Sequence, residues 1–258
     1  MFISIICQKG GVGKTTLSVN ISDIIAKKGK KTLLIDLDPQ GNSTTYLYNK
    51  KKNSSFDALT LLEEKEPINI EEITEVRENL FLIPGNQKIK RLINEKLFAG
   101  SVLYKRKRNN EFLPFENIVI DTPPAMNSLV HESINVSDYY LIPTRAEYLS
   151  VEGVGQAIEY VKRIVSNNRN INPIFLGVVL NSVDKRRVSY KTFYSELRFI
   201  LGDKLFETTI SQLTEIADAP FYGKTGYEYN PNGNAHKELT LLVEEIDKRI
   251  EGYSWKEN

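Results

Sequence analysis

The chain has 258 residues and carries 34 Lys and Arg against 33 Asp and Glu, which leaves a formal net charge of +1. Hydrophobic residues make up 41% and charged residues 26%, a composition that excludes disordered and fibrous proteins. The single cysteine excludes an internal disulfide, and the near-zero charge excludes a whole-molecule polycation but not a local basic patch.

Short apolar runs alternate with longer segments of helical periodicity along the whole chain. Continuous runs of Ile, Val and Leu are typical of strands that helices cover on both faces. The predicted strands are 2–7, 31–36, 79–83, 117–121, 139–142 and 174–180, and the predicted helices are 15–28, 55–65, 85–98, 125–135, 150–166, 187–201 and 234–251. This alternation predicts an α/β fold, a single doubly wound domain over 1–258 with a mostly parallel central sheet and a flexible tail at about 252–258.

No segment has the pattern of an export signal or a membrane span. The longest apolar run, 174–180, contains a glycine, whereas a spanning helix needs about 20 apolar residues. The apolar segment 2–7 has no positively charged region before it. We therefore expect a cytoplasmic protein that does not use the membrane as a partner.

A glycine- and lysine-rich loop follows the first predicted strand and precedes the first predicted helix. Glycine lets consecutive backbone N–H groups approach phosphate oxygens, and the helix directs its positive end at the same place. A lysine at the end of such a loop reaches the β and γ phosphates, and the hydroxyl after it can ligate Mg²⁺. The sequence predicts a nucleotide site formed by Lys9, Gly10, Gly11, Val12, Gly13, Lys14, Thr15 and Thr16.

Acidic residues end two further predicted strands. Asp36 closes the second strand and Asp38 follows it, while Asp121 closes the strand NIVID in the manner of a Walker B carboxylate. Because parallel strands deliver their carboxyl ends to one edge of the sheet, these side chains are expected to meet the phosphate loop. An aspartate after a strand can also simply cap a turn, and this alternative is open for Asp36.

Six motifs occur in order from residue 1 to about 247: KGGVGKTT, LLIDLDPQGNST, IVIDTPPA, IPTRAEYLSVEG, NSVDKR and IADAPFYGKTGYEY. Together they resemble the ParA/Soj partition ATPases, which are P-loop NTPases of the deviant Walker A type, a group that also includes MinD. Gln8 stands where the strict Walker A pattern has its first glycine, and Lys9 is the additional lysine of the deviant form.

The resemblance implies roles for the matching positions. Lys9 is expected to cross a dimer interface and touch the partner's nucleotide, and Asp38 to orient the attacking water, so Lys9, Lys14 and Asp38 are the expected catalytic residues. Thr15, Asp36 and Asp121 are expected to serve the metal. Pro123 is expected to contact the γ-phosphate and Asn181 to read the adenine ring.

The resemblance also implies a nucleotide switch. ATP with Mg²⁺ is expected to favour a homodimer that binds DNA without sequence preference and is nucleoid-associated, and a ParB-type partner is expected to stimulate hydrolysis. The expected role is plasmid or chromosome partition. Two alternatives are a ParA-like ATPase that positions a protein cargo and a membrane-cycling MinD-like ATPase, although the acidic Glu244 and Glu245 do not suit a membrane-binding tail.

The DNA-binding surface is where the chain departs from the family pattern. Gln212 and Glu215 stand where family members often carry arginines. Replacement candidates are Lys185, Arg186 and Arg187, and the run Lys105, Arg106, Lys107 and Arg108. Such charge runs can also be merely a solvated face.

Overall fold

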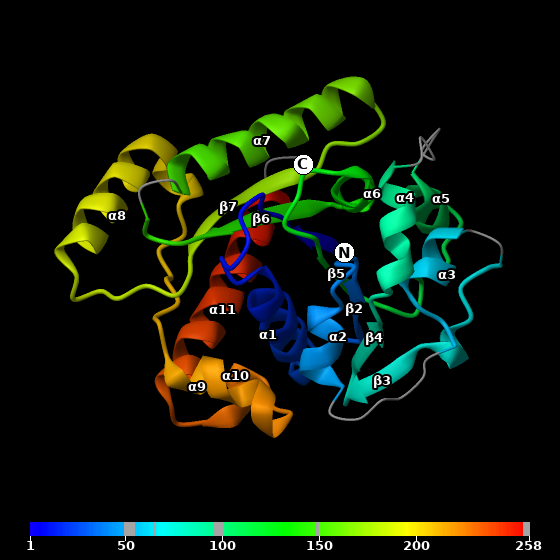
Figure 1. The fold of residues 1–258 in the computed structure, drawn as a ribbon, viewed down its shortest axis with the longest axis horizontal. Coiled ribbons are helices and arrows are strands. Elements are labelled where there is room, and N and C mark those ends of the chain that lie inside the picture. Colours follow the sequence, from blue (N-terminus) through cyan, green and yellow to red (C-terminus); the bar gives the residue numbers. More distant parts are fainter. Residues whose placement is uncertain (49–54, 64–65, 95–100, 148–149, 255–258) are drawn as a thin grey trace.

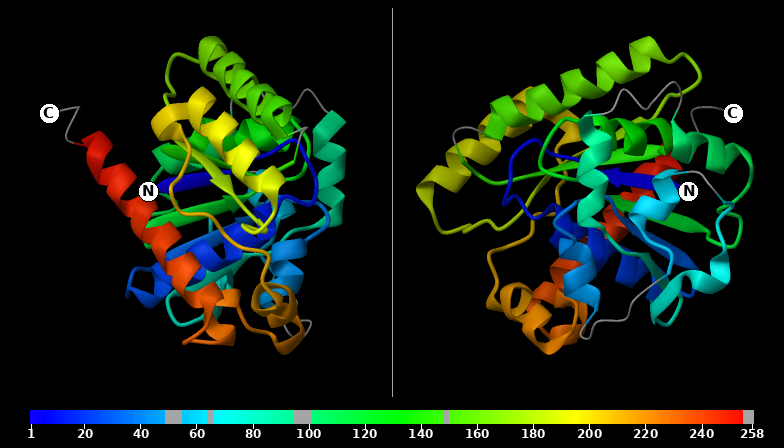
Figure 2. Two further views of the ribbon diagram at one scale, coloured as in Figure 1. Left: turned by 90° about the vertical axis from the view of Figure 1, so that its left-hand side faces the viewer. Right: turned by 45° about the vertical axis from the view of Figure 1, so that its right-hand side comes forward.

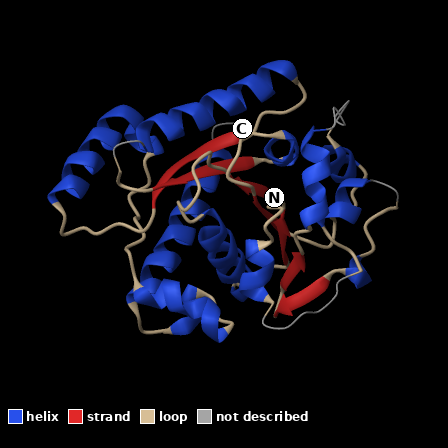
Figure 3. Ribbon diagram, viewed as in Figure 1, coloured by secondary structure: helices blue, strands red, loops and turns tan. Residues whose placement is uncertain are grey.

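The computed structural model describes residues 1–258 except 49–54, 64–65, 95–100, 148–149 and 255–258. The described part is built around one sheet with the strand order β3-β4-β2-β5-β1-β6-β7, surrounded by helices (Figure 3). The strands are β1 (Phe2–Ile5), β2 (Thr32–Asp36), β3 (Thr74–Arg77), β4 (Leu80–Ile83), β5 (Asn117–Asp121), β6 (Tyr139–Thr144) and β7 (Ile174–Leu180). Only the pairing of β3 with β4 is antiparallel in this sheet. The predicted mostly parallel α/β fold is confirmed.

Helices connect the parallel strands, as right-handed crossovers require. They are α1 (Lys14–Lys27), α2 (Asn42–Leu47), α3 (Ala58–Glu63), α4 (Lys90–Asn94), α5 (Val102–Arg108), α6 (Ser128–Val136), α7 (Ser150–Asn167), α8 (Val188–Leu201), α9 (Thr214–Asp218), α10 (Gly226–Tyr229) and α11 (Asn234–Ser254). Short 3₁₀ turns are η1 (Ile70–Glu72), η2 (Gln87–Ile89), η3 (Gly202–Lys204) and η4 (Ala219–Tyr222). No helix among the described residues is both long and apolar enough to cross a membrane.

Side chains alternate between the two faces of the sheet, and each face has its own apolar core. Leu34 packs with buried residues of α1, α2 and α11 on one face. Leu33 and Ile35 point the other way, into a core that includes α3, α5 and α6. α7 and α8 cover the β6–β7 end of that second face. Figures 1 and 2 show these two helical layers with the sheet between them.

Several boundaries differ from the prediction. The strand predicted over 2–7 ends at Ile5, and the helix predicted over 125–135 begins at Ser128, where Asn127 accepts hydrogen bonds from Leu129 N and Val130 N. The predicted helix 85–98 is split into η2 and α4, and its last residues lie outside the described part. α11 continues to Ser254, so residues 252–254 of the expected flexible tail are helical, and 255–258 are not described.

The strand order places the functional segments together. β1 lies between β5 and β6, and β5 lies between β1 and β2. The carboxyl ends of these parallel strands therefore share one edge of the sheet, where the phosphate loop, Asp36, Asp121 and the segments after β6 and β7 emerge (Figure 1).

Candidate functional site

The phosphate loop joins β1 to α1 and has the backbone geometry that the glycines predict. Gly13 precedes α1 with a φ of 90°, a left-handed conformation that side chains rarely adopt. A Cβ at this position would lie 1.9 Å from Asn181 Nδ2. Position 13 therefore favours glycine because of its backbone angle, and any Cβ there would also displace the side chain of Asn181.

Lys14 lies at the first turn of α1 and is almost fully buried. The residue is 6% exposed, and Nζ donates to the Lys9 carbonyl oxygen at 3.4 Å. Burial lowers the pKa of Lys14, while Cys7, Asp121 and Asp38 oppose that shift. A buried ammonium beside a helix N-terminus is an environment that favours an anion such as phosphate.

Asp36 and Asp121 face each other from neighbouring strands. They are register partners in the β2–β5 pair, and both are completely buried. Burial, followed by the charge of Asp121, raises the pKa of Asp36 to about 7. Burial likewise raises the pKa of Asp121, against hydrogen bonds from Ser43 and Thr15 and the charge of Lys14. Two buried carboxyl groups with one lysine leave an acidic site that a further cation would neutralise.

The groups around Asp121 fit Mg²⁺. Thr15 Oγ1 donates to Asp121 Oδ2 at 2.8 Å, which leaves the lone pairs of the Thr15 hydroxyl available for a cation. No cluster of three or more His, Cys, Asp or Glu side chains with metal-site geometry occurs among the described residues. Mg²⁺ suits such a sparse oxygen site, because it keeps several waters and binds through one or two protein groups plus phosphates.

Both carboxylate oxygens of Asp36 accept hydrogen bonds from the segment that follows it. Its Oδ1 accepts Asp38 N at 3.1 Å, and its Oδ2 accepts Thr44 N at 2.9 Å and Thr44 Oγ1 at 2.7 Å. In this state Asp36 organises the turn that carries Asp38, as the capping alternative predicts. A direct role for Asp36 toward the metal stays a prediction.

Asp38 itself is held close to the site. It is 5% exposed, and its Oδ1 accepts Gln40 N at 2.9 Å. The loop after β4 presses against this turn, since a Cβ at Gly85 would lie 2.9 Å from the Asp38 carbonyl oxygen. The backbone of Gly85 therefore packs directly against the backbone of Asp38 and restricts its position.

The Lys9 side chain is paired with Glu147, in the segment that follows β6. Its Nζ forms an ion pair with Glu147 Oε2 at 2.5 Å, and Arg145 lies 3.7 Å from the other oxygen of Glu147. Both Lys9 and Glu147 are well exposed, so this pair is worth only about 0–1 kcal/mol. Lys9 is therefore restrained but can be released at low cost.

Asn181 and Pro123 complete the set of predicted contacts. Asn181 follows β7, is 5% exposed and donates from Nδ2 to the Val12 carbonyl oxygen at 2.8 Å. Pro123 is buried next to Thr122, whose hydroxyl donates to the Ile5 carbonyl oxygen at 2.7 Å. Asn181 therefore lies against the phosphate loop. The contact of Asn181 with adenine and the contact of Pro123 with the γ-phosphate stay predictions.

The two predicted basic runs differ in the structure. The Lys105–Arg108 run belongs to α5, and its Arg106 is 1% exposed and donates to the carbonyl oxygens of Leu61 and Glu66. Lys107 pairs with Asp138 at 2.5 Å. This run was expected as a surface patch. That expectation is wrong for Arg106, because its buried guanidinium donates hydrogen bonds to carbonyl oxygens in and after α3.

Lys185, Arg186 and Arg187 are exposed just before α8. The Arg186 and Arg187 side chains are 90% and 72% exposed, and both lie near Asp184. Glu215, at one of the replaced arginine positions, accepts Ala235 N at 2.8 Å and Asn230 Nδ2 at 3.1 Å. Glu215 therefore secures the start of α11.

Sequence reasoning missed Ser43, Thr44 and Glu147 as members of the site. Ser43 Oγ donates to Asp121 Oδ2 at 2.7 Å, and Thr44 binds Asp36. The only signal was their place in the motifs LLIDLDPQGNST and IPTRAEYLSVEG. Neither motif shows which hydroxyl turns toward Asp36 or Asp121, or which carboxylate pairs with Lys9.

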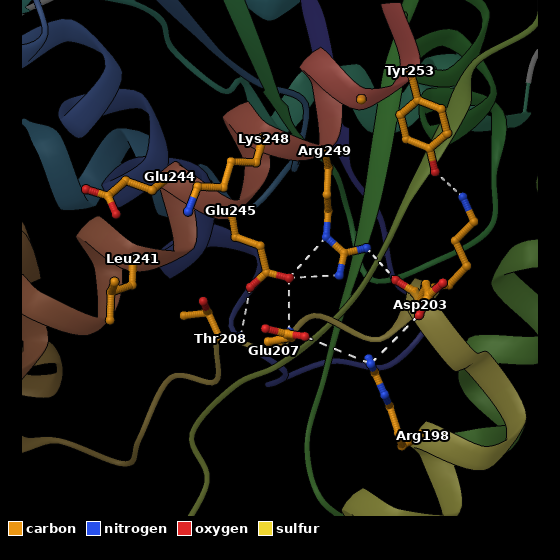
Figure 4. Close-up of a pocket in the computed structure, with 12 residues that line it drawn as sticks. Arg198, Asp203, Glu207, Thr208, Leu241, Glu244, Glu245, Lys248, Arg249 and Tyr253 are labelled. Carbon is orange, nitrogen blue, oxygen red and sulfur yellow. Dashed lines mark hydrogen bonds and ion pairs between the residues drawn. The ribbon is translucent and has the colours of Figure 1, made fainter. Parts of the chain in front are cut away.

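A separate cleft of about 730 Å³ lies between the end of α8 and α11 (Figure 4). Its charges are largely paired with one another: Arg249 binds Glu245 at 2.8 Å, and Arg198 lies near Asp203 and Glu207. Glu245 also accepts hydrogen bonds from Glu207 N and Thr208 N, which hold the segment beside β7 against α11. This cleft lacks a phosphate-binding loop, and its contacts are those of a structural network.

Comparisons with known proteins agree with this geometry. A family model described as an AAA domain matches residues 1–173. The sporulation initiation inhibitor protein Soj of Bacillus subtilis is 32% identical over 95% of this chain and 97% of its own. The chromosome-partitioning ATPase Soj of Thermus thermophilus is 28% identical over 96% of each chain.

A solved structure gives the same result in three dimensions. A plasmid partition protein of Borrelia burgdorferi B31 bound to AMPPNP has a TM-score of 0.81 and 26% identity, covering 96% of this chain and 98% of its own. The phosphate loop, the paired strand-end carboxyls and these matches together show that the chain belongs to the ParA/Soj family.

Proposed function

We propose that the protein is a Mg²⁺-dependent ATPase that acts as a nucleotide-switched homodimer in plasmid or chromosome partition. The observation that carries this proposal is the convergence of Lys14, Thr15, Asp38 and Asp121 on the phosphate loop at one edge of the sheet. The name of the Thermus thermophilus relative, a chromosome-partitioning ATPase, and the AMPPNP in the Borrelia structure support ATP as the nucleotide.

The residues of the site have different roles in nucleotide binding and hydrolysis. The loop N–H groups and Lys14 hold the phosphates, and Thr15 with Asp121 holds Mg²⁺, which supplies charge neutralisation at the phosphates. Asp38 orients the attacking water. Lys9 leaves the exposed Glu147 and reaches the nucleotide of a second subunit, where its charge stabilises the transferring phosphoryl group.

The ATP-bound dimer binds DNA without sequence preference and is associated with the nucleoid in the cytoplasm. Lys185, Arg186 and Arg187 form the contact surface that the exposure of these side chains supports. A partner of the ParB type stimulates hydrolysis and releases the dimer. These steps rest on the family resemblance together with the exposed cations.

A protein cargo is the second candidate function, and one observation favours it. Position 215 carries a carboxylate engaged with α11 instead of an exposed cation, and Gln212 is uncharged. The chain therefore offers less positive charge in this region than a DNA-binding surface built on arginines at both positions. Salt-dependent retention on DNA distinguishes the two functions.

Replacement of Asp38 by Ala tests the proposal. Because Asp38 orients water and does not hold the phosphates, Asp38→Ala should bind ATP with Mg²⁺ normally and hydrolyse it at least about tenfold more slowly. The measurements are fluorescent-ATP binding and steady-state phosphate release. The exposed Asp203 in the cleft of Figure 4 provides the matched control, Asp203→Ala, which should turn over like the unaltered protein. Normal turnover by Asp38→Ala would reject the role of Asp38.

A further inference from the structure

Three hydroxyl groups surround the carboxylate of Asp121. Thr15 and Ser43 both donate to Oδ2, at 2.8 Å and 2.7 Å, and Ser18 lies 3.2 Å from Oδ1. Ser18 also donates to the Lys14 carbonyl oxygen at 2.9 Å, and its single proton serves only one acceptor at a time. Thr15 and Ser43 thus each direct their hydroxyl hydrogen bond to Asp121.

Thr15 and Ser43 approach Asp121 from different parts of the chain. Thr15 belongs to the phosphate-loop end of α1, and its hydroxyl is the expected Mg²⁺ ligand. Ser43 belongs to α2, five residues after Asp38, and is completely buried. A buried hydroxyl whose proton is committed to a carboxylate holds that carboxylate and its own segment together.

The segment from Asp38 to Thr44 is fixed at two neighbouring carboxyl groups. Asp38 N and Thr44 bind Asp36, and Thr44 Oγ1 also accepts Gly85 N at 2.8 Å. Only Ser43 among these contacts reaches Asp121, the carboxylate that also binds Thr15. The Ser43 hydroxyl therefore links the carboxylate of Asp121 to the segment that carries Asp38, in addition to the backbone hydrogen bond from Leu37 N to the Asp121 carbonyl oxygen at 2.9 Å.

We propose that Ser43 is a positioning residue that ties the Asp38 segment to Asp121, so that binding of nucleotide with Mg²⁺ at Thr15 and Asp121 fixes the place of Asp38. This inference rests on the proposed function. It assigns to Ser43 a part in hydrolysis without contact with ATP or the metal.

Hydrogen exchange tests the link without relying on turnover. In the unaltered protein, AMPPNP with Mg²⁺ should slow exchange both in the phosphate loop, residues 9–17, and in the segment 38–47. In Ser43→Ala, protection of 9–17 should persist while the added protection of 38–47 is lost. The kcat for ATP should fall about tenfold with KM changed less than about twofold, because the lost contact orients Asp38 and does not hold the phosphates.

Two further variants separate the hydroxyl from packing. Thr45→Ala removes an exposed hydroxyl of the same helix, one that donates to the Gly41 carbonyl oxygen, and should behave like the unaltered protein. Ser43→Thr retains a hydroxyl and should keep more of the 38–47 protection than Ser43→Ala. Exchange in β1 and β5 without nucleotide verifies that each variant is folded.

The outcomes distinguish the inference from the proposed function. Full nucleotide-dependent protection of 38–47 in Ser43→Ala overturns the inference but not the proposed function. The same holds if Ser43→Thr and Ser43→Ala, both folded, lose equal amounts of protection in 38–47. Absence of protection at 9–17 in the unaltered protein overturns the nucleotide site itself, and the inference with it.

Discussion

Asp23 shows how a single buried group affects stability outside the nucleotide site. It lies on α1, is completely buried, and its Oδ2 accepts the Thr225 hydroxyl at 2.7 Å. Its Oδ1 has no hydrogen-bond partner, although Lys27 lies 3.8 Å away. Burial, aided by Glu228, raises the pKa of Asp23 from 3.8 to about 6, against Thr225, Lys27 and Arg77.

The raised pKa fixes the sign of a pH effect. The folded state binds the proton of Asp23 more tightly than the unfolded state does. Protonation of Asp23 therefore contributes fully to the free energy of unfolding below about pH 4, and this contribution is lost as the pH rises through about 6. Asp23→Asn keeps an acceptor for Thr225 and cannot ionise. Its stability relative to the unaltered protein should therefore increase by about 1 kcal/mol between pH 5 and pH 8.

Urea unfolding at the two pH values measures this difference. The matched control is Asp247→Asn, which alters a half-exposed carboxylate paired with Lys28 and should show little change with pH. A stability difference for Asp23→Asn that stays the same at pH 5 and pH 8 would contradict the assigned titration.

Among the site residues that the sequence predicted, Gly13 is one whose type the backbone geometry demands. Gly13 must be glycine because of its left-handed φ and the approach of Asn181, so the pattern itself reveals it. Ser43 and Glu147 are found only in the structure. A serine or glutamate is common on any loop, and its inward or outward direction depends on tertiary packing.

At the scale of elements, the buried parallel strands were predictable and the short polar elements were not. β1, β2, β5, β6 and β7 are continuous apolar runs buried on both faces. By contrast β3, with the sequence TEVR, is an edge strand held by pairing with β4. The six-residue α2 depends on its contacts with Asp36 and Asp121, which no local pattern records.

α5 illustrates the opposite error. Its sequence VLYKRKR has the appearance of a solvated basic run, yet Leu103 and Arg106 are buried. Arg106 lies within a few residues of Glu111, forms an ion pair with it and satisfies carbonyl oxygens of the α3 region. Composition alone does not distinguish a buried arginine from an exposed one.

The segment before α8 is where DNA binding is predicted. Changing Lys185, Arg186 and Arg187 together to Glu should abolish ATP-dependent retention on DNA at low salt. If all three contact phosphates, the slope of log affinity against log salt for the unaltered protein should include about 0.9 per contact.

A charge-matched control uses the exposed Lys28, Lys30 and Lys31 beyond the end of α1, changed together to Glu. This control makes the same change in net charge and should retain most DNA binding. Intact DNA retention by the Lys185, Arg186 and Arg187 variant would show that this segment is not the DNA surface.

For the molecule as a whole, the charge balance limits how DNA can be bound. A net charge of +1 supplies no general attraction to nucleic acid. A local patch doubled by the pairing of two subunits would make binding strong only in the ATP state, since two linked patches act together. The near-neutral composition is thus consistent with a switch.

The central claim is that the phosphate loop with Lys14 binds and hydrolyses ATP. Phosphate release from ATP with Mg²⁺, compared between the unaltered protein and Lys14→Ala, tests it most directly. Because Lys14 is buried beside the strand-end carboxyls and is the cation at the expected phosphate position, Lys14→Ala should lose at least about 10²-fold in kcat/KM. A Lys14→Ala protein that binds and hydrolyses ATP like the unaltered chain would contradict the assigned site.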